Sequence, residues 1–446
     1  MKKIALISSF IAVAIAAASC GRQVYKSADA IPVNYLSVER VVNSAEFLPA
    51  PPDSASAVWL HDVERYQWGK TMRGTPRGYQ AVKDAYISGA GLADAFSEAF
   101  GMEISFEKTP AIYTLIRHMC EDAGSLSTKL AKERYFRPRP YMVFGEPTSI
   151  PEAEDALRNN GSYPSGHSAM GFAVALVLSE VNPGRAAQIM QRGYDIGESR
   201  VIAGYHFDSD VRMGRLCASM VVPVLHSDAR FMRDLEAAKR EFAKLWPKAT
   251  PDAASAVLDK YSGDENVRHV AIVRCKGGSD AEVAIYGRDS IIPGWKFICG
   301  ADAFIGRNGF TADKREGDGM TPVGDFGVLS AFGILPAPGE CAFPYVNVDE
   351  HIYAVDTDNE FYNKIVDTRK EGPRQGEHMI EYAPEYNYGL ALDYNKECVP
   401  GLGSNIFFHC KGAKPFTGGC VAVDESLMKG IVSCFGPADR VVILPE

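Results

Sequence analysis

Positive charge is scarce in this 446-residue sequence, because 47 lysines and arginines stand against 56 aspartates and glutamates, a formal net charge of −9. Basic runs interleaved with aromatic residues are also missing, so we expect no nucleic-acid partner. The ten cysteines contain no C-x-x-C pair that would suggest zinc, and internal repeats do not stand out. Apolar residues still make up 46% of the chain, which excludes wholesale disorder.

Long hydrophobic runs are missing beyond the first twenty residues, so we expect no membrane-spanning helix. At the start, two lysines precede an apolar run over residues 4–18, and Cys20 follows small residues. This order is typical of a secretory signal peptide, and its end resembles a bacterial lipobox. We expect a signal peptide over 1–19, lipidation at Cys20, a tether over 20–44, and a periplasmic or envelope location with only the lipid anchor in the membrane. Simple secretion with a free Cys20 is the alternative.

Export would permit disulfides, which persist outside the cytosol. Cys20 is assigned to lipidation after signal-peptide cleavage and Cys420 to a site described below, which leaves eight of the ten cysteines, an even number. We expect Cys120 to pair with Cys217, and the connectivity of the six later cysteines stays open.

The spacing of apolar residues along the chain changes once, near residues 250–265. Before this point apolar residues recur at helical spacing, whereas short apolar runs such as HVAIVRC and RVVILP alternate with glycine and proline turns after it. We predict a multidomain protein, with an all-α helical bundle over 45–248, a linker over 249–265 and a mainly-β domain over 266–446. The expected helices cover residues 62–68, 81–100, 111–135, 168–181, 186–205 and 210–225.

Three polar clusters mark the helical half. They are KERYFRPRP with Lys132 and Arg139, GSYPSGH with Ser165, Gly166 and His167, and SRVIAGYHFDSD with Arg200, His206 and Asp210. Each has an ordinary structural explanation, such as a salt bridge or a capping histidine. Together they suit a phosphoryl group, because a helix that begins after a glycine turn directs free N–H groups at an anion and the basic side chains add charge.

The order K-x6-R-P, PSGH and S-R-x5-H-x3-D resembles the signature of the type 2 phosphatidic acid phosphatase superfamily. The longer stretches GSYPSGH, ALVLSEVNP and GESRVIAGYHFDSDV are similar to class A nonspecific acid phosphatases. The resemblance covers roughly residues 45–245. It implies a soluble phosphomonoester substrate, and a vanadate-dependent haloperoxidase is the alternative within the superfamily.

The resemblance also implies a role for each matching residue. His206 would be the nucleophile that forms a phosphohistidine, Asp210 would accept the other ring N–H of His206, and His167 would act as general acid and then base. The phosphate oxygens would be held by Lys132, Arg139, Arg200 and the backbone of Ser165 and Gly166. This chemistry requires no metal, so we expect no metal or cofactor.

The β-rich half contains GDGMTPVGDFGV and IFFHCKGAKPFTGGCVAVD. In the second stretch His409 ends a strand-like run and Cys420 follows two glycines, an order compatible with a cysteine nucleophile, a base and backbone oxyanion donors. The alternative from the residues alone is a disulfide-bonded cysteine and a structural histidine.

The pattern D-G-x-T-P-x-G-x-F, then a histidine, then T-G-G-C-V resembles the L,D-transpeptidase (YkuD-type) catalytic domain, over about residues 267–446. It implies action on peptidoglycan stem peptides. The usual S-H-G-C is T-G-G-C here and Ala422 stands where many members carry arginine, so carboxypeptidase activity, other acyl transfer and non-catalytic peptidoglycan binding or docking stay open. The implied site has Cys420 as nucleophile, His409 as base, an oxyanion hole at Gly418 and Gly419, Thr417 in the motif's Ser/Thr place, and His378 as a further polar candidate.

Overall fold

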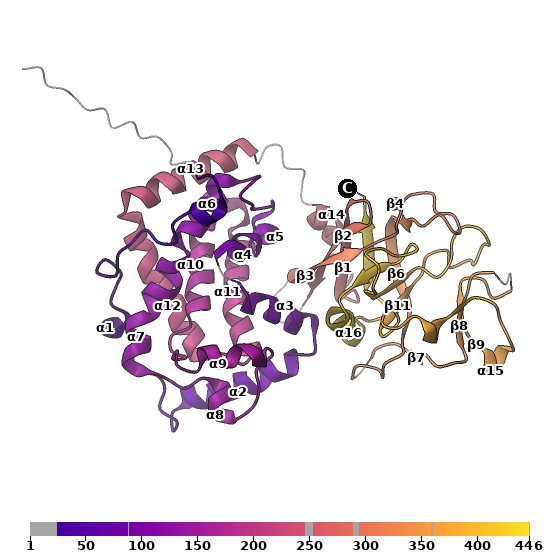
Figure 1. The fold of residues 1–446 in the computed structure, drawn as a ribbon, viewed down its shortest axis with the longest axis horizontal. Helices are drawn as coiled ribbons and strands as arrows, with labels where there is room; N and C mark the ends of the chain where they lie inside the picture. The colour runs from indigo at the N-terminus through magenta and orange to yellow at the C-terminus, as the bar shows by residue number, and fades with distance from the viewer. Residues whose placement is uncertain are drawn as a thin grey trace, which may run out of the picture.

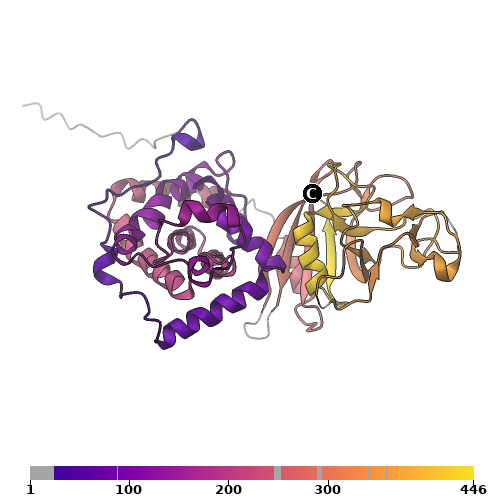
Figure 2. The ribbon, with the colours of Figure 1, turned by 60° about the horizontal axis from the view of Figure 1, so that its bottom comes forward.

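The computed structural model describes residues 25–87, 89–245, 253–288, 294–339, 341–357 and 360–445. The expected signal peptide and lipidated Cys20 lie outside these ranges. Helices form the first half of the chain and strands dominate the second, and the two halves lie side by side (Figures 1 and 2). In the described ranges, no helix combines the length and the apolar character that crossing a membrane requires.

The helical half is a bundle around α10 (Gly166–Val181), which packs against α11 (Ala186–Ile202) and α12 (Asp208–His226). Ten of the 16 residues of α10 are buried, as expected for a helix that is apolar on all sides. The other helices are α1 Ser44–Phe47, α2 Ala57–Met72, α3 Pro76–Ala85, α4 Gly89–Asp94, α5 Ser97–Phe100, α6 Pro110–Glu121, α7 Ser127–Tyr135, α8 Pro140–Phe144, α9 Glu154–Leu157 and α13 Ala229–Leu245.

Two of the predicted helices are divided in the structure, and one helix was not predicted. The helix expected over 81–100 is divided into α3, α4 and α5. The short helix α4 begins at Gly89 and contains Gly91, and glycine is a poor helix former, which disfavours one continuous helix here. The helix expected over 111–135 is interrupted by a π-helix at Asp122–Leu126. The helix α13 was not among the expected ones, although its buried Phe231, Leu235 and Ala238 follow helical spacing.

The β-rich half is built on a closed barrel. Its main sheet has the strand order β11-β12-β13-β3-β2-β1-β14-β6-β7, and a further pairing of β11 with β6 closes the ring and leaves β7 outside it. The strands of this sheet are β1 His269–Gly277, β2 Asp280–Gly287, β3 Lys296–Phe304, β6 Gly324–Gly333, β7 Tyr345–Asn347, β11 Gly389–Leu392, β12 Phe407–Cys410, β13 Val421–Val423 and β14 Arg440–Leu444.

Smaller elements complete this half. They are the sheets β10-β8-β9 and β4-β5, and the helices α14, α15 and α16. Their bounds are α14 Ala253–Lys260, β4 Phe310–Thr311, β5 Thr321–Pro322, β8 Ile352–Val355, β9 Lys364–Asp367, α15 Thr368–Glu371, β10 Glu377–His378 and α16 Glu425–Cys434.

Both faces of strand β1 are buried, because side chains alternate between two apolar clusters. Ala271 and Val273 belong to the larger barrel cluster, whereas Val270 and Ile272 pack in the cluster that contains Leu258 of α14. The predicted linker over 249–265 therefore contains a helix that covers the barrel.

The predicted Cys120–Cys217 disulfide is wrong. All nine described cysteines are free. Cys120 is buried in the main bundle cluster, and Cys217 lies in a separate cluster with Leu48 and Ala131. Each thiol therefore packs as a small apolar group.

The two halves contact each other through α3, which packs against β3 and α16 (Figure 1). The Tyr79 hydroxyl donates to the Asp424 carboxylate at 2.7 Å, and the amide of Gly300 donates to the Gln80 side chain at 3.3 Å. Asp424 follows Cys420 by four positions, so this interface lies close in the chain to the predicted cysteine site.

Candidate active sites

The ends of the bundle helices bring the three polar motifs together. Lys132 and Arg200 lie in the last turns of α7 and α11. Arg139 stands at the N-cap position of α8 without a capping side-chain bond, and Ser165 caps α10. His206 stands between α11 and α12 and Asp210 lies in the first turn of α12. Burial lowers the pKa of His206 well below its usual value, and the charges of Arg139, Lys132 and Arg200 and the nearby His167 lower it further.

The hydrogen bonds of His206 decide which ring nitrogen carries the proton. Its Nδ1 lies 2.8 Å from the Ser162 carbonyl oxygen, which can only accept, so Nδ1 is the donor. Nε2 then carries the lone pair, and Arg139 Nη1 donates to it at 3.1 Å. A neutral imidazole whose Nε2 keeps its lone pair is the form that a nucleophile requires.

Asp210 does not hold the ring directly, in contrast to its predicted role. Its Oδ2 lies 3.7 Å from His206 Nδ1, whereas it accepts the Ser162 hydroxyl at 2.5 Å. The other carboxylate oxygen accepts from Arg137 Nη1 at 2.6 Å. Asp210 therefore fixes the Ser162 segment, and the Ser162 carbonyl orients the ring.

Arg137 is the residue that sequence reasoning missed. It is 7% exposed, and besides Asp210 it donates to the Ser209 hydroxyl and to Asp62 Oδ2, both at 2.8 Å. One feature of the sequence could have pointed to Arg137, because RPRP contains two arginines and the motif K-x6-R-P uses only the second. Nothing local indicated that Asp62, about 75 positions earlier, would complete the network.

The beginning of α10 supplies part of the expected anion site. The amides of Gly166 and His167 stand at the first two helical positions, where no intrahelical acceptor exists. The amide of Ser165 differs from the prediction, because it donates to the Asp210 carbonyl at 2.9 Å. Ser165 instead caps the helix through its hydroxyl, which accepts the Ser168 amide.

Arg200 has donors without acceptors. Its side chain is buried, and neither Nε nor Nη1 has a hydrogen-bond partner among the described residues. Its guanidinium lies 4.5 Å from the centre of the Tyr205 ring. Burial and the charge of Arg139 lower its pKa to about 10. Buried donors of this kind are normally satisfied, so the arrangement is complementary to an anion.

The pKa values of Lys132 and His167 are also lowered by their surroundings. Burial and the charge of Arg139 lower the pKa of Lys132 to about 7, while its Nζ donates to the Gly161 carbonyl at 2.5 Å. Burial, Arg200 and Arg139 hold the pKa of His167 well below its usual value. A bound phosphate would favour the protonated form of both groups by offsetting the neighbouring positive charge.

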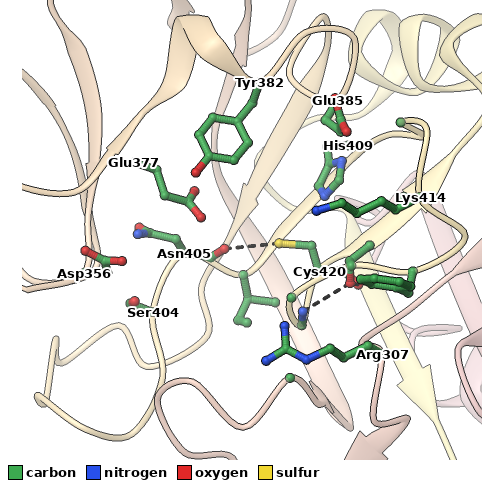
Figure 3. A pocket seen from close by; sticks show the side chains of 18 of the residues that line it. Arg307, Asp356, Glu377, Tyr382, Glu385, Ser404, Asn405, His409, Lys414 and Cys420 are labelled. Atoms are coloured by element: carbon green, nitrogen blue, oxygen red, sulfur yellow. Dashed lines mark hydrogen bonds between the residues drawn. The ribbon is translucent and has the colours of Figure 1, made fainter.

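A second site lies in a cavity of 370 Å³ in the β-rich half, and both Cys420 and His409 line it. The parallel pairing of β12 with β13 places His409 opposite Ala422, two residues after Cys420. Figure 3 shows the side chains of His409 and Cys420 in this cavity. His409 Nδ1 lies 2.8 Å from the Cys410 carbonyl oxygen, so Nδ1 carries the proton and Nε2 is left as a base.

The Cys420 thiol is protonated in this arrangement. It donates to the Asn405 carbonyl at 3.3 Å and accepts from the Phe407 amide at 3.3 Å, and burial raises its pKa to about 12. The contact between thiol and Asn405 is drawn in Figure 3. A base must therefore remove this proton before the sulfur can act as a nucleophile.

Gly418 and Gly419 line the cavity as predicted, but the Gly419 amide is not free, and His378 lies outside the cavity. The amide of Gly419 donates to the Thr417 hydroxyl at 3.1 Å, so it is engaged within the protein. His378 is held on the surface by Glu381 and by the Glu350 carbonyl, and it does not line the cavity. In the part of the chain that the structure describes, no three His, Cys, Asp or Glu side chains are grouped as metal ligands.

Comparison with known proteins assigns the helical half. Residues 113–232 match the PAP2 superfamily. The non-specific acid phosphatase of Providencia stuartii is 48% identical over 211 residues, which cover 47% of this chain and 85% of that protein. The corresponding Salmonella typhimurium enzyme is 38% identical over 49% of this chain and 86% of its own length, and the Zymomonas mobilis acid phosphatase is 35% identical over 46% and 78%.

These relatives are matched over most of their length, and each covers less than half of this chain. The β-rich half is therefore additional to the acid-phosphatase unit. Together with the motifs that converge around His206, the identities establish that the chain belongs to the PAP2 superfamily and is an acid phosphatase of the nonspecific type.

Proposed function

We propose that the bundle hydrolyses soluble phosphomonoesters through a phosphohistidine at His206, and that the barrel is a cysteine-dependent, L,D-transpeptidase-like domain acting on peptidoglycan stem peptides. The observation that carries the first part is the pair of unpartnered donors on buried Arg200, close enough to His206 for its charge to lower the histidine's pKa. The relatives support a phosphatase rather than a haloperoxidase, because each is an acid phosphatase by name.

In the first step, the Nε2 lone pair of His206 attacks phosphorus, a P–N bond forms and the ester P–O bond breaks. His167 donates its proton to the leaving alkoxide. The Ser162 carbonyl, bonded to Nδ1–H, stabilises the positive charge that develops on the ring. Lys132, Arg139, Arg200 and the first amides of α10 hold the three phosphoryl oxygens.

In the second step, His167 is neutral and accepts a proton from water, whose oxygen attacks phosphorus as the P–N bond breaks. The electron pair returns to His206 Nε2, and phosphate is released. Asp210 remains an anion paired with Arg137 and acts by holding Ser162 in place.

The anion site should be pH-dependent because the pKa of Lys132 is about 7. Below this value the side chain is a cation and attracts an oxyanion, and above it the neutral amine does not. Tungstate, whose charge is constant in this range, should inhibit competitively with a Ki that rises up to about tenfold per pH unit above the pKa. In Lys132→Arg the rise should disappear, since arginine stays charged. A Ki independent of pH in the unmodified protein would contradict this role for Lys132.

The acyl-transfer part is supported by Cys420 and His409 lining one cavity, with Nε2 of His409 available as a base. His409 would take the thiol proton when substrate displaces the Asn405 contact. The sulfur would then attack a peptide carbonyl, and the C–N bond would break as His409 returns the proton to the leaving amine. The alternative is a barrel that only binds or docks to peptidoglycan.

A carbapenem tests this part, because its strained amide acylates an activated cysteine. Intact-mass analysis should show one adduct per chain, absent in Cys420→Ala and formed at least about 100-fold more slowly in His409→Ala. Hydrolysis of p-nitrophenyl phosphate should be unchanged in Cys420→Ala. A full-length protein that forms no adduct would favour the binding or docking alternative.

The location is proposed from the sequence alone. A lipidated Cys20 would tether the enzyme to a membrane by its anchor and place both sites in the cell envelope, where stem peptides and exported phosphomonoesters are found.

A further inference from the structure

The first described residues of the chain, 25–36, are docked on the bundle, and we call them the strap. Ile31, Tyr35 and Leu36 are each no more than 2% exposed and belong to the main bundle cluster. The amides of Tyr35 and Leu36 both donate to the Asp122 carboxylate, at 2.6 and 2.9 Å. Because backbone groups and apolar side chains are held together, this part of the expected tether packs as part of the bundle.

The strap lies against the beginning of α13. The Tyr35 hydroxyl donates to the carboxylate of Asp234 in this helix at 2.7 Å. Burial and the charge of Asp234 raise the pKa of Tyr25, while the charges of Arg230 and Arg233 lower it. Tyr25 also packs against the main bundle cluster. The start of the strap therefore lies beside the first turns of α13.

The proposed lipid anchor is close in the chain to this contact. Cys20 stands five positions before Tyr25, and five fully extended residues span at most about 18 Å. A lipid on Cys20 would hold Tyr25, and with it the first turns of α13, within about this distance of the membrane surface. The docked strap thus determines which side of the bundle would face the membrane.

Helix α13 has two chemically different faces. Its apolar face packs against α6 and is fully buried at Phe231 and Leu235. The opposite face carries Arg233, Arg240 and Lys244, which are all exposed and which we call the basic line. Intervals of seven and four residues place these three side chains one above another along the helix. The face that points away from the bundle is therefore cationic.

The protein does not neutralise the basic line. Arg230 and Lys239, at the borders of this face, form ion pairs with Asp228 and Glu180. The exposed Glu236 pairs with Lys239 at 3.5 Å. Within the described ranges, no ion pair includes a residue of the basic line. Exposed cations without an acidic partner attract an anionic surface, and a basic amphipathic helix suits the interface of a membrane.

The phosphatase site lies at the other end of the bundle. In Figure 1, α13 runs along the top of the bundle and α8 lies at the bottom. Arg139 stands at the N-cap of α8 and donates to His206. With α13 on a membrane, the phosphatase site would be directed away from the lipid, where soluble phosphomonoesters have access to it.

We propose that the basic line of α13 is a contact surface for the headgroups of an anionic phospholipid bilayer. The helix would lie parallel to the membrane, with its arginine and lysine side chains among the phosphate groups. The orientation rests on the lipidation of Cys20 proposed above. The lipid contact itself requires only the exposed cations, so the two parts can be tested separately.

The contact is tested with Cys20→Ser, a full-length chain that cannot be acylated. Co-sedimentation at low ionic strength should show at least about tenfold stronger partitioning into vesicles of phosphatidylcholine with phosphatidylglycerol than into phosphatidylcholine alone. The difference should disappear at about 1 M salt, where charges are screened. Adding Arg233→Gln, Arg240→Gln and Lys244→Gln should weaken binding by about tenfold or more, because each cation near an anionic surface contributes roughly fivefold.

The matched control removes the same charge elsewhere, by Lys370→Gln, Lys396→Gln and Lys429→Gln on exposed lysines of the β-rich half. This triple variant should partition as Cys20→Ser does. Hydrolysis of p-nitrophenyl phosphate should be unchanged in both triple variants, which shows that they fold. Equal partitioning into both kinds of vesicle, or equal losses in the two triple variants, would overturn the contact surface.

The orientation is tested in the acylated protein on anionic vesicles. An amine-reactive reagent should label Lys244 at least about threefold more slowly than in detergent, whereas labelling of Lys370 should not change. Equal labelling of Lys244 in both conditions would overturn the orientation. Intact-mass analysis that finds no lipid on Cys20 would overturn the anchor, whereas partitioning of Cys20→Ser into anionic vesicles would still support the contact surface.

Discussion

Replacing His206 with alanine is expected to lower kcat for p-nitrophenyl phosphate by at least about a thousandfold. Nε2 of this ring combines a lone pair, an adjacent arginine and a proton fixed on the opposite nitrogen. Without it water would have to attack directly, although the cationic groups that bind the phosphate would remain. Substrate binding should therefore be affected less than turnover.

The measurement is steady-state kinetics together with rapid-quench trapping of a labelled phosphoenzyme. The trapped species should be stable to alkali, labile to acid and absent in His206→Ala. His226→Gln is a matched control, because His226 lies at the far end of α12 with Glu180 as its partner. Turnover by His206→Ala above about a hundredth of the unmodified rate would rule out His206 as the nucleophile.

Replacing Arg137 with methionine is expected to lower the free energy of unfolding of the bundle by about 3–5 kcal/mol. The substitution removes a cation that is 7% exposed and leaves Asp62 and Asp210, both fully buried, without their ion-pair partner. An unpaired buried charge costs more than the lost bonds alone. Phosphatase activity should fall as well, since Asp210 holds the Ser162 segment that orients His206.

Urea unfolding followed by tryptophan fluorescence measures the stability change, because Trp59 packs beside Arg137 and Phe207. Arg158→Met is the control, since Arg158 forms an exposed pair with Asp155 and its loss should change stability by less than about 1 kcal/mol. A double variant, Arg137→Met with Asp62→Asn, should recover part of the loss. A loss below about 1 kcal/mol in Arg137→Met would show that the network is not the stabilising element described here.

The motifs were sufficient to predict a set of polar residues that the structure brings to the ends of neighbouring helices, because three ordered patterns each carry their own spacing. Lys132 and Arg200 lie in the last turns of their helices and Gly166 begins a helix. The sequence placed Gly166 at a helix start from the glycine turn before it, whereas the helix predicted over 186–205 extended beyond Arg200. The fold class of each half followed from the spacing of apolar residues. The prediction for Asp210 was incomplete because a four-residue spacing puts two side chains on one face without deciding whether they touch.

The disulfide prediction shows where the sequence was insufficient. An exported protein with an even number of remaining cysteines favours disulfides, yet Cys120 and Cys217 are free and pack in separate clusters. Composition reports how many thiols a chain has, and only the packing of helices decides which ones meet.

The sequence by itself determined a helical half followed by a strand-rich half, the acid-phosphatase motifs and the candidate pair of Cys420 and His409, because periodicity and motif spacing are local properties. Only the tertiary structure decided that the Ser162 carbonyl orients His206, that Arg137 joins Asp62 to Asp210, and that Cys420 and His409 line one cavity. These contacts join residues up to about 150 positions apart in the bundle network. Their partners are chosen by how buried charges and hydrogen-bonding groups are satisfied once the elements pack, which no local pattern records.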